Sequence, residues 1–224
     1  MLNEEYIRKN SNELKESLRQ KSIFNGRINI EYKDKFPLTI DSAIVWNRLE
    51  EIPEKLIKNI STIKIGDFAE LKKREIDSLY DNGVIYITNR QVNVNDVIED
   101  VIHEIGHAIE EQYTNFLYKD DKIKEEYEMK FNKLSSILDE HGFSVDSYKK
   151  SKRYTVDDLF YKVIGYEKLS SFTQGLFISP YSATTLREYF ATGFETYVLE
   201  EDNSYLEKIS PNLYQKLVEI YQNE

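Results

Sequence analysis

The stretch that decides the fold is Val101-Ile102-His103-Glu104-Ile105-Gly106-His107-Ala108-Ile109. It has the pattern H-E-x-x-H. On an α-helix, residues four apart lie on one face, so the imidazoles of His103 and His107 can reach one ion together. Imidazole is a common ligand of Zn²⁺, and Glu104 stands where a carboxylate can take a proton from a water bound to that ion. The stretch therefore predicts one zinc ion per chain, with two histidine ligands and Glu104 as the base.

The residues around this stretch favour the helix that the pattern needs. We expect Asn95 to cap the helix and Asp96 to lie in its first turn. Apolar residues then recur at helical spacing and predict one buried stripe: Val97, Ile98, Val101, Ile102, Ile105, Ala108 and Ile109. Both histidines fall off the centre of that stripe. The alternative is that the two histidines merely flank a core face. That explanation fits a lone histidine better than it fits a complete H-E-x-x-H pattern.

The composition is that of a soluble globular protein. The chain has 224 residues, of which 40% are hydrophobic and 31% charged, so one domain of two lobes is expected. It has no cysteine, which limits the remaining metal ligands to histidine and carboxylate. The net charge of −10 argues against nucleic acid as a partner.

The ends and the hydropathy of the chain give an expectation of its location. No apolar run is long enough for a membrane span, and the first residues lack the pattern of a signal peptide. The chain as written is therefore expected in the cytoplasm. A secreted or delivered effector whose leader is absent from the sequence is the alternative.

Short strands and helices are predicted before the H-E-x-x-H helix. Alternating or β-branched residues and a turn at 81–83 indicate strands, and apolar residues at helical spacing indicate helices. The predicted strands are 27–32, 61–66 and 84–88, and the predicted helices are 49–60, 68–80 and a surface helix or arm at 3–20. We expect the strand at 84–88 to be an exposed edge, where a protein or peptide substrate in extended form pairs through its backbone.

Three features are predicted after the metal helix. Residues 120–140 form a second amphipathic helix that Gly142 ends, and His141 is interpreted as a cap rather than a ligand. The basic cluster at 149–153 is interpreted as a solvated loop. The aromatic residues near 150–178 are interpreted as an insert that gates a cleft or docks a partner.

A third metal ligand is expected farther along the chain, because a catalytic zinc usually takes three protein ligands. The long metzincin signature is excluded, since Glu110 and Tyr113 stand where it needs glycine and histidine. Glu188 and Glu195 lie seven apart on a predicted helix and can share a face. Either can be the ligand. Small residues at 191 and 193 suggest close packing against another helix and favour Glu188.

These motifs together resemble the catalytic domain of the anthrax toxin lethal factor family, and they are similar to the related secreted Pro-Pro endopeptidases. The likeness covers the chain from about Val101 to the C-terminus. It is carried by H-E-I-G-H-A-I-E-E at 103–111, by E-Y-F-A-x-x-F at 188–194 with a tyrosine seven residues before its glutamate, and by I-S-P-N-L-Y at 209–214. The interval between the two site motifs is longer than in lethal factor, and Thr192 replaces an acidic residue of that family.

The resemblance implies a zinc-dependent endopeptidase and assigns roles to five residues. His103, His107 and Glu188 would hold the zinc. Glu104 would activate water, and Tyr181 would steady the negative oxygen that forms on the attacked carbonyl. A toxin or effector is one role that the resemblance implies.

The predicted fold class is α+β, with a two-lobed zincin-like metalloprotease fold. Residues 1–224 are expected to form a single catalytic domain. Its N-terminal α/β lobe at 1–118 would hold a small mixed sheet and the metal-site helix, and its C-terminal lobe at 119–224 would be mainly helical. Two alternatives stay open at this point: an intracellular regulatory protease that cuts a repressor-type partner, and a non-catalytic zincin-like binding module.

Overall fold

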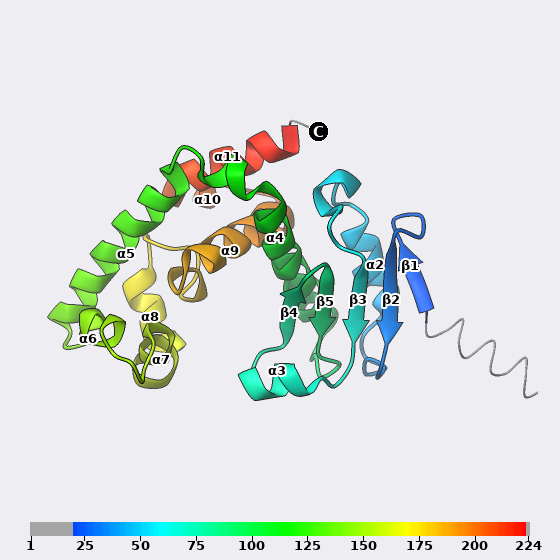
Figure 1. The fold of residues 1–224 in the computed structure, drawn as a ribbon, viewed down its shortest axis with the longest axis horizontal. Coiled ribbons are helices and arrows are strands. Elements are labelled where there is room, and N and C mark those ends of the chain that lie inside the picture. Colours follow the sequence, from blue (N-terminus) through cyan, green and yellow to red (C-terminus); the bar gives the residue numbers. More distant parts are fainter. Residues whose placement is uncertain (1–19, 223–224) are drawn as a thin grey trace, which may run out of the picture. The chain divides into compact units, whose positions relative to one another are not determined.

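The computed structural model describes residues 20–222, and the chain divides into two compact units (Figure 1). The N-terminal unit ends at Ala108 and the C-terminal unit begins at Ile109, so the boundary falls inside helix α4 (Val94–Tyr118). The first unit holds a small mixed sheet and the second is helical, so the described chain is α+β. Except for residue 20, the predicted arm at 3–20 lies outside the described residues.

The sheet of the N-terminal unit has the strand order β1-β2-β3-β5-β4. Its three inner strands are parallel, and β1 and β4 run antiparallel to their neighbours. Apolar side chains alternate along the inner strands and are buried on the core side. The strands are β1 (Gln20–Ile23), β2 (Ile28–Tyr32), β3 (Thr62–Ile65), β4 (Ser78–Asp81) and β5 (Val84–Ile87). Three of them confirm predicted strands.

Strand β4 corrects two predictions. The helix expected over 68–80 is only α3 (Ala69–Arg74), and Glu75 ends it with a left-handed φ of 56°. The next residues pair with β5 through a tight turn, in which Asn82 and Gly83 both have positive φ. Strand β5 is therefore an inner strand, and among residues 20–222 the sheet ends on this side at β4. Residues 78–81 form a strand because hydrogen bonds to β5 satisfy their backbone groups. The apolar spacing that suggested a helix extends over too few residues to distinguish the two structures.

The other helices of the N-terminal unit are short. Helix α2 (Ser42–Leu49) begins at an N-cap, Asp41, whose side chain accepts from the backbone N–H of Ala43, and it buries Trp46. The helix predicted over 49–60 is only the 3₁₀ helix η1 (Glu54–Ile57), because Pro53 before it has an extended backbone with ψ of 123°.

Helix α4 has the buried stripe that the sequence predicts. All seven predicted apolar positions are buried. Its N-terminal cap is Asn93 rather than Asn95, since the Asn93 side chain accepts from the backbone N–H groups of Asn95 and Asp96. The amide of Asn59 donates to the carbonyl of Ala108 over 2.7 Å, which ties the helix to the loop before β3. The helix kinks at Tyr113.

The C-terminal unit is built around α5 and α9. Helix α5 (Lys122–Glu140) is confirmed, and Gly142 follows it with a φ of 85°. The rest are α6 (Val145–Lys149), α7 (Val156–Asp158), the π-helical turn η2 (Leu159–Ile164), α8 (Tyr166–Thr173), the 3₁₀ turn η3 (Tyr181–Ala183), α9 (Leu186–Leu199), α10 (Ser204–Ile209) and α11 (Pro211–Gln222). Gly193 confirms the predicted close packing, because a Cβ there would lie 2.3 Å from Leu213 of α11.

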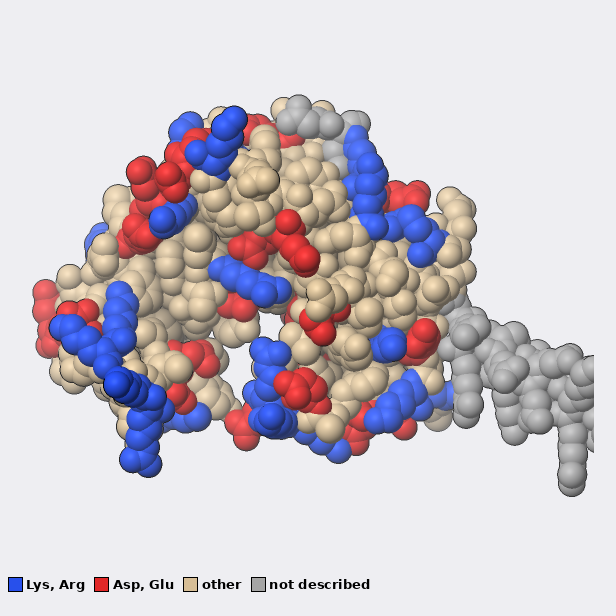
Figure 2. All heavy atoms as spheres, in the orientation of Figure 1, with Lys and Arg blue, Asp and Glu red and all other residues tan. Residues whose placement is uncertain are grey.

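The surface of this unit carries the predicted basic cluster. Figure 2 shows Lys and Arg side chains gathered over α6 and the segment that leads to α7, where residues 149–153 lie. The cations of this run are exposed, as expected of a solvated loop. No helix among residues 20–222 is long and apolar enough to span a membrane.

Candidate metal centre

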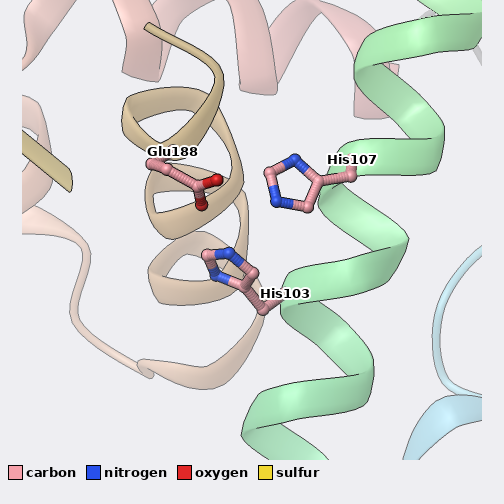
Figure 3. A group of neighbouring side chains, drawn as sticks. All are labelled: His103, His107 and Glu188. Carbon is pink, nitrogen blue, oxygen red and sulfur yellow. The ribbon is translucent and has the colours of Figure 1, made fainter. Parts of the chain in front are cut away.

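Three of the predicted site residues lie together. The potential ligand atoms of His103, His107 and Glu188 are all within 4.8 Å of one another, and Figure 3 shows their side chains pointing toward a common point. Two imidazoles and a carboxylate form a donor set that suits Zn²⁺. Ligand atoms of a tetrahedral zinc site lie about 3.4 Å apart if each bond is ~2.1 Å long. The limit of 4.8 Å for the three candidate ligand atoms is wider than this spacing.

The two histidines owe their positions to helix α4. They are one helical turn apart, and their ring centroids are 4.9 Å apart with the planes nearly perpendicular. His107 is buried and His103 is half-buried. The apolar stripe holds the helix against the core and leaves this adjacent face for the imidazoles.

Glu104 lies on the same helix but turns toward strand β4. Ser78 Oγ donates to Glu104 Oε1 over 2.6 Å, and the backbone N–H of Tyr80 donates to Oε2 over 2.6 Å. The residue is only 5% exposed, so these bonds compensate for the burial of a carboxylate. Sequence reasoning missed both partners because it assigned their segment to a helix.

Asp100 is a further acidic group one turn before Glu104. Its side chain accepts a hydrogen bond from the Gln91 amide. Burial raises the pKa of Asp100 to about 7, and the carboxylates of Asp77 and Glu104 also raise it. Near neutral pH this face of α4 therefore holds a carboxyl group that is readily protonated.

Glu188 lies in the first turn of α9. The Thr185 side chain caps this helix by accepting from the backbone N–H of Glu188 over 3.1 Å. The neighbouring Arg187 has its Nε 3.8 Å from a carboxylate oxygen of Glu110, a residue of α4 before the kink. Glu195 does not belong to the metal-binding group. The structure thus brings Glu188, of the two candidate glutamates, to the histidines.

Tyr181 lies in η3, the short turn just before α9. It is 41% exposed, and its ring meets that of Tyr166 edge-on at 6.4 Å. Tyr166 donates to Asp157 over 3.5 Å, and both of these residues are close enough to Glu188 for its charge to raise their pKa, after the larger effect of burial. The aromatic segment at 150–178 therefore packs beside Tyr181 and contributes to the electrostatic surroundings of Glu188.

His141 is the third histidine of the chain and is separate from this group. It is exposed at the C-terminus of α5, where its Nδ1 lies 2.7 Å from the carbonyl of Ile137. This position agrees with its interpretation as a helix cap. Within the described part of the chain, no metal-binding group includes it.

No protein-family model, no curated protein and no solved structure matches this chain. The resemblance to the lethal factor family thus stays a prediction, and the site must be argued from its own geometry.

Proposed function

We propose that this protein is a zinc-dependent endopeptidase of the zincin-like class, similar to lethal factor, and that a toxin or effector role would suit it. The observation that carries the proposal is the group of His103, His107 and Glu188 within 4.8 Å, with Glu104 next to the first ligand. Three protein ligands that leave a fourth position open are the usual arrangement of a catalytic zinc.

Glu104 is suited to the role of general base and then general acid. When bound, zinc would polarise the scissile carbonyl and lower the pKa of water. Glu104 would take the proton from water and pass it to the leaving amine. Each of its oxygens accepts one hydrogen bond from β4, and a carboxylate has about four lone-pair sites, so each oxygen keeps room for a proton.

Tyr181 is suited to stabilising the negative charge that develops on the attacked carbonyl oxygen. Its phenol is exposed, and the turn that carries it is held by hydrogen bonds, including the donation from Thr184 Oγ1 to the Tyr181 carbonyl over 2.8 Å. An O–H donor aimed at such an oxygen acts most strongly on charge that appears only in the transition state.

Strand β4, an edge strand of the described sheet, is the proposed place where an extended peptide substrate pairs. The N–H of Thr88 in the neighbouring chain segment donates to the carbonyl of Asp77. Because backbone groups alternate along an antiparallel strand, those of Ser78 and Tyr80 turn away from β5. The N–H of Tyr80 already donates to Glu104, so an added peptide would pair at Ser78 rather than with that N–H. A peptide can add to such an edge through its main chain, which gives affinity with little dependence on sequence. This moves the proposed substrate strand from residues 84–88 to β4.

A non-catalytic binding module is the second candidate. It is favoured by the two hydrogen bonds from β4 to Glu104. In such a module the role of this carboxylate would be to join α4 to the sheet, without any part in catalysis. In that case the site would hold metal without turnover.

The proposal is tested by zinc content and cleavage together. Elemental analysis of wild type should give about one zinc per chain, Glu188→Ala should lose it, and Glu195→Ala should retain it. Wild-type protein should then cleave members of a peptide library. Absence of zinc would contradict the metal site itself. Stoichiometric zinc without cleavage would favour the binding module.

A further inference from the structure

A buried polar network lies directly beside Glu188 in the C-terminal unit. Lys130 Nζ of α5 donates to Tyr189 Oη over 2.6 Å and to Ser210 Oγ over 2.8 Å. Tyr189 in turn donates to Glu126 Oε1 over 2.7 Å. All four side chains are buried, with exposures between 0% and 6%. Three helical elements are therefore joined by polar bonds inside an apolar core.

Glu126 extends this network to the start of α11. Its two carboxylate oxygens accept from the backbone N–H groups of Asn212 and Leu213, which a helix N-terminus leaves without partners of its own. A carboxylate there also interacts favourably with the helix dipole. One glutamate thus fixes both the phenol of α9 and the first turn of α11.

The network is not a reaction centre of its own. A lysine beside a serine can act as base and nucleophile, and burial lowers the pKa of Lys130 to about 8, although Glu126 partly offsets this. However, Ser210 is 0% exposed and Lys130 is 6% exposed. A substrate cannot reach either group, so the bonds serve the placement of helices.

We propose that Tyr189, held by Glu126 and Lys130, is a positioning residue that sets Glu188 for metal binding. The inference rests on the proposed function and deepens it. Glu188 lies in the first turn of α9, where one side-chain cap fixes the helix start. Tyr189 is the next residue, about 100° farther around the helix, and it is anchored to Glu126 and Lys130 of α5. Its two hydrogen bonds limit rotation and sliding of α9, and these are the motions that would move the carboxylate.

Tyr127 of α5 offers a matched control. It also lies in this aromatic core, with its ring 5.6 Å from that of Tyr189, but its hydroxyl donates to the carbonyl of Ala183 in η3 over 3.1 Å. Tyr127→Phe and Tyr189→Phe remove the same atom from the same region. Only the second change releases the residue next to Glu188.

The experiment measures zinc affinity by competition with a chelator, in wild type, Tyr189→Phe, Tyr127→Phe and Glu188→Ala. Loss of outer support typically weakens metal affinity about 10–100-fold, so Tyr189→Phe should weaken it about tenfold. Tyr127→Phe should stay within about twofold of wild type on the same scale. The visible spectrum of bound Co²⁺, which reports ligand geometry, should change in Tyr189→Phe and stay like that of wild type in Tyr127→Phe.

The double variant Tyr189→Phe/Glu188→Ala shows whether the effect passes through the ligand. It should bind zinc no more weakly than Glu188→Ala does, because the ligand that Tyr189 positions is already gone. If Tyr189→Phe does not fold, Ser210→Ala replaces it. That change loosens Lys130 and should weaken zinc binding in the same direction by a smaller factor.

Three outcomes would overturn the inference. In the first, Tyr189→Phe (or Ser210→Ala in its place) binds zinc as tightly as wild type. In the second, it loses no more zinc affinity than Tyr127→Phe does. In the third, it weakens zinc binding in the Glu188→Ala background by the same factor as in wild type. Each leaves the proposed function standing as long as wild type binds zinc and Glu188→Ala does not. If wild type binds no zinc, the proposed function fails, and the inference fails with it.

Discussion

Helices α4 and α9 supply the candidate ligands, and different kinds of contact hold the two helices in place. Helix α4 lies against the core through an apolar stripe, and its two histidines are placed relative to each other by helical spacing alone. Helix α9 has a buried polar anchor, Tyr189, whose partner Glu126 is 63 residues away in the chain. One half of this candidate site is therefore encoded locally, whereas the other depends on long-range packing.

The largest effect is expected on the α4 side, from Glu104→Gln. Glutamine cannot take the proton, so turnover should fall about 10²–10⁴-fold, the usual contribution of a general base. Zinc content should remain at the wild-type value, because Glu104 is not among the grouped ligands. The measurement is the cleavage rate on a library-selected peptide beside elemental analysis. Substantial remaining activity would show that another group is the base.

A smaller effect is expected on the α9 side, from Tyr181→Phe. Loss of one donor to developing negative charge typically lowers kcat about 10²–10³-fold. Zinc affinity should be unchanged, since the proposed ligands are His103, His107 and Glu188. Tyr205→Phe, at another exposed tyrosine in the same unit, is the control and should leave kcat unchanged. Equal rates for the two variants would remove Tyr181 from the mechanism.

The smallest effect concerns Asp100 and the pH dependence of the free energy of unfolding. Its pKa is raised to about 7 in the folded protein, so folding favours the protonated carboxyl. Stability should therefore fall as the pH rises from about 4 through 7, by about 2 kcal/mol for a partly exposed group at 1.36 kcal/mol per pKa unit. Asp100→Asn stays neutral and should not show this fall.

Urea denaturation of the metal-free protein at pH 5 and pH 8 measures this effect. The free energy of unfolding of Asp100→Asn should exceed that of wild type by more at pH 8 than at pH 5. Asp96→Asn, in the first turn of the same helix, serves as the comparison. Parallel curves for wild type and Asp100→Asn would contradict the sign of the shift.

The histidine pair, the stripe of α4 and three strands were predictable from the sequence because each depends on neighbours within a few residues. The edge strand was not. Residues 68–80 have apolar positions that fit a helical period, and only the pairing of β4 with β5 shows that 78–81 is extended. The partners of Glu104 were missed for the same reason.

The buried network was also missed, although α5 carries a faint signal. Glu126 and Lys130 are four apart and lie beside the apolar positions of a predicted amphipathic helix, so at least one of the two had to approach the core. The pattern does not reveal their partners, because Tyr189 and Ser210 lie far along the chain.

The amino-acid sequence alone identifies the candidate metal ligands and shows which of them share a helix face, because helical spacing is a local property of the backbone. It favoured Glu188 over Glu195 as the third ligand without showing that Glu188 lies near the histidines. That proximity is a property of the tertiary structure, since the position of α9 depends on Gly193 against Leu213 and on hydrogen bonds from α5. These contacts join residues that no local pattern connects.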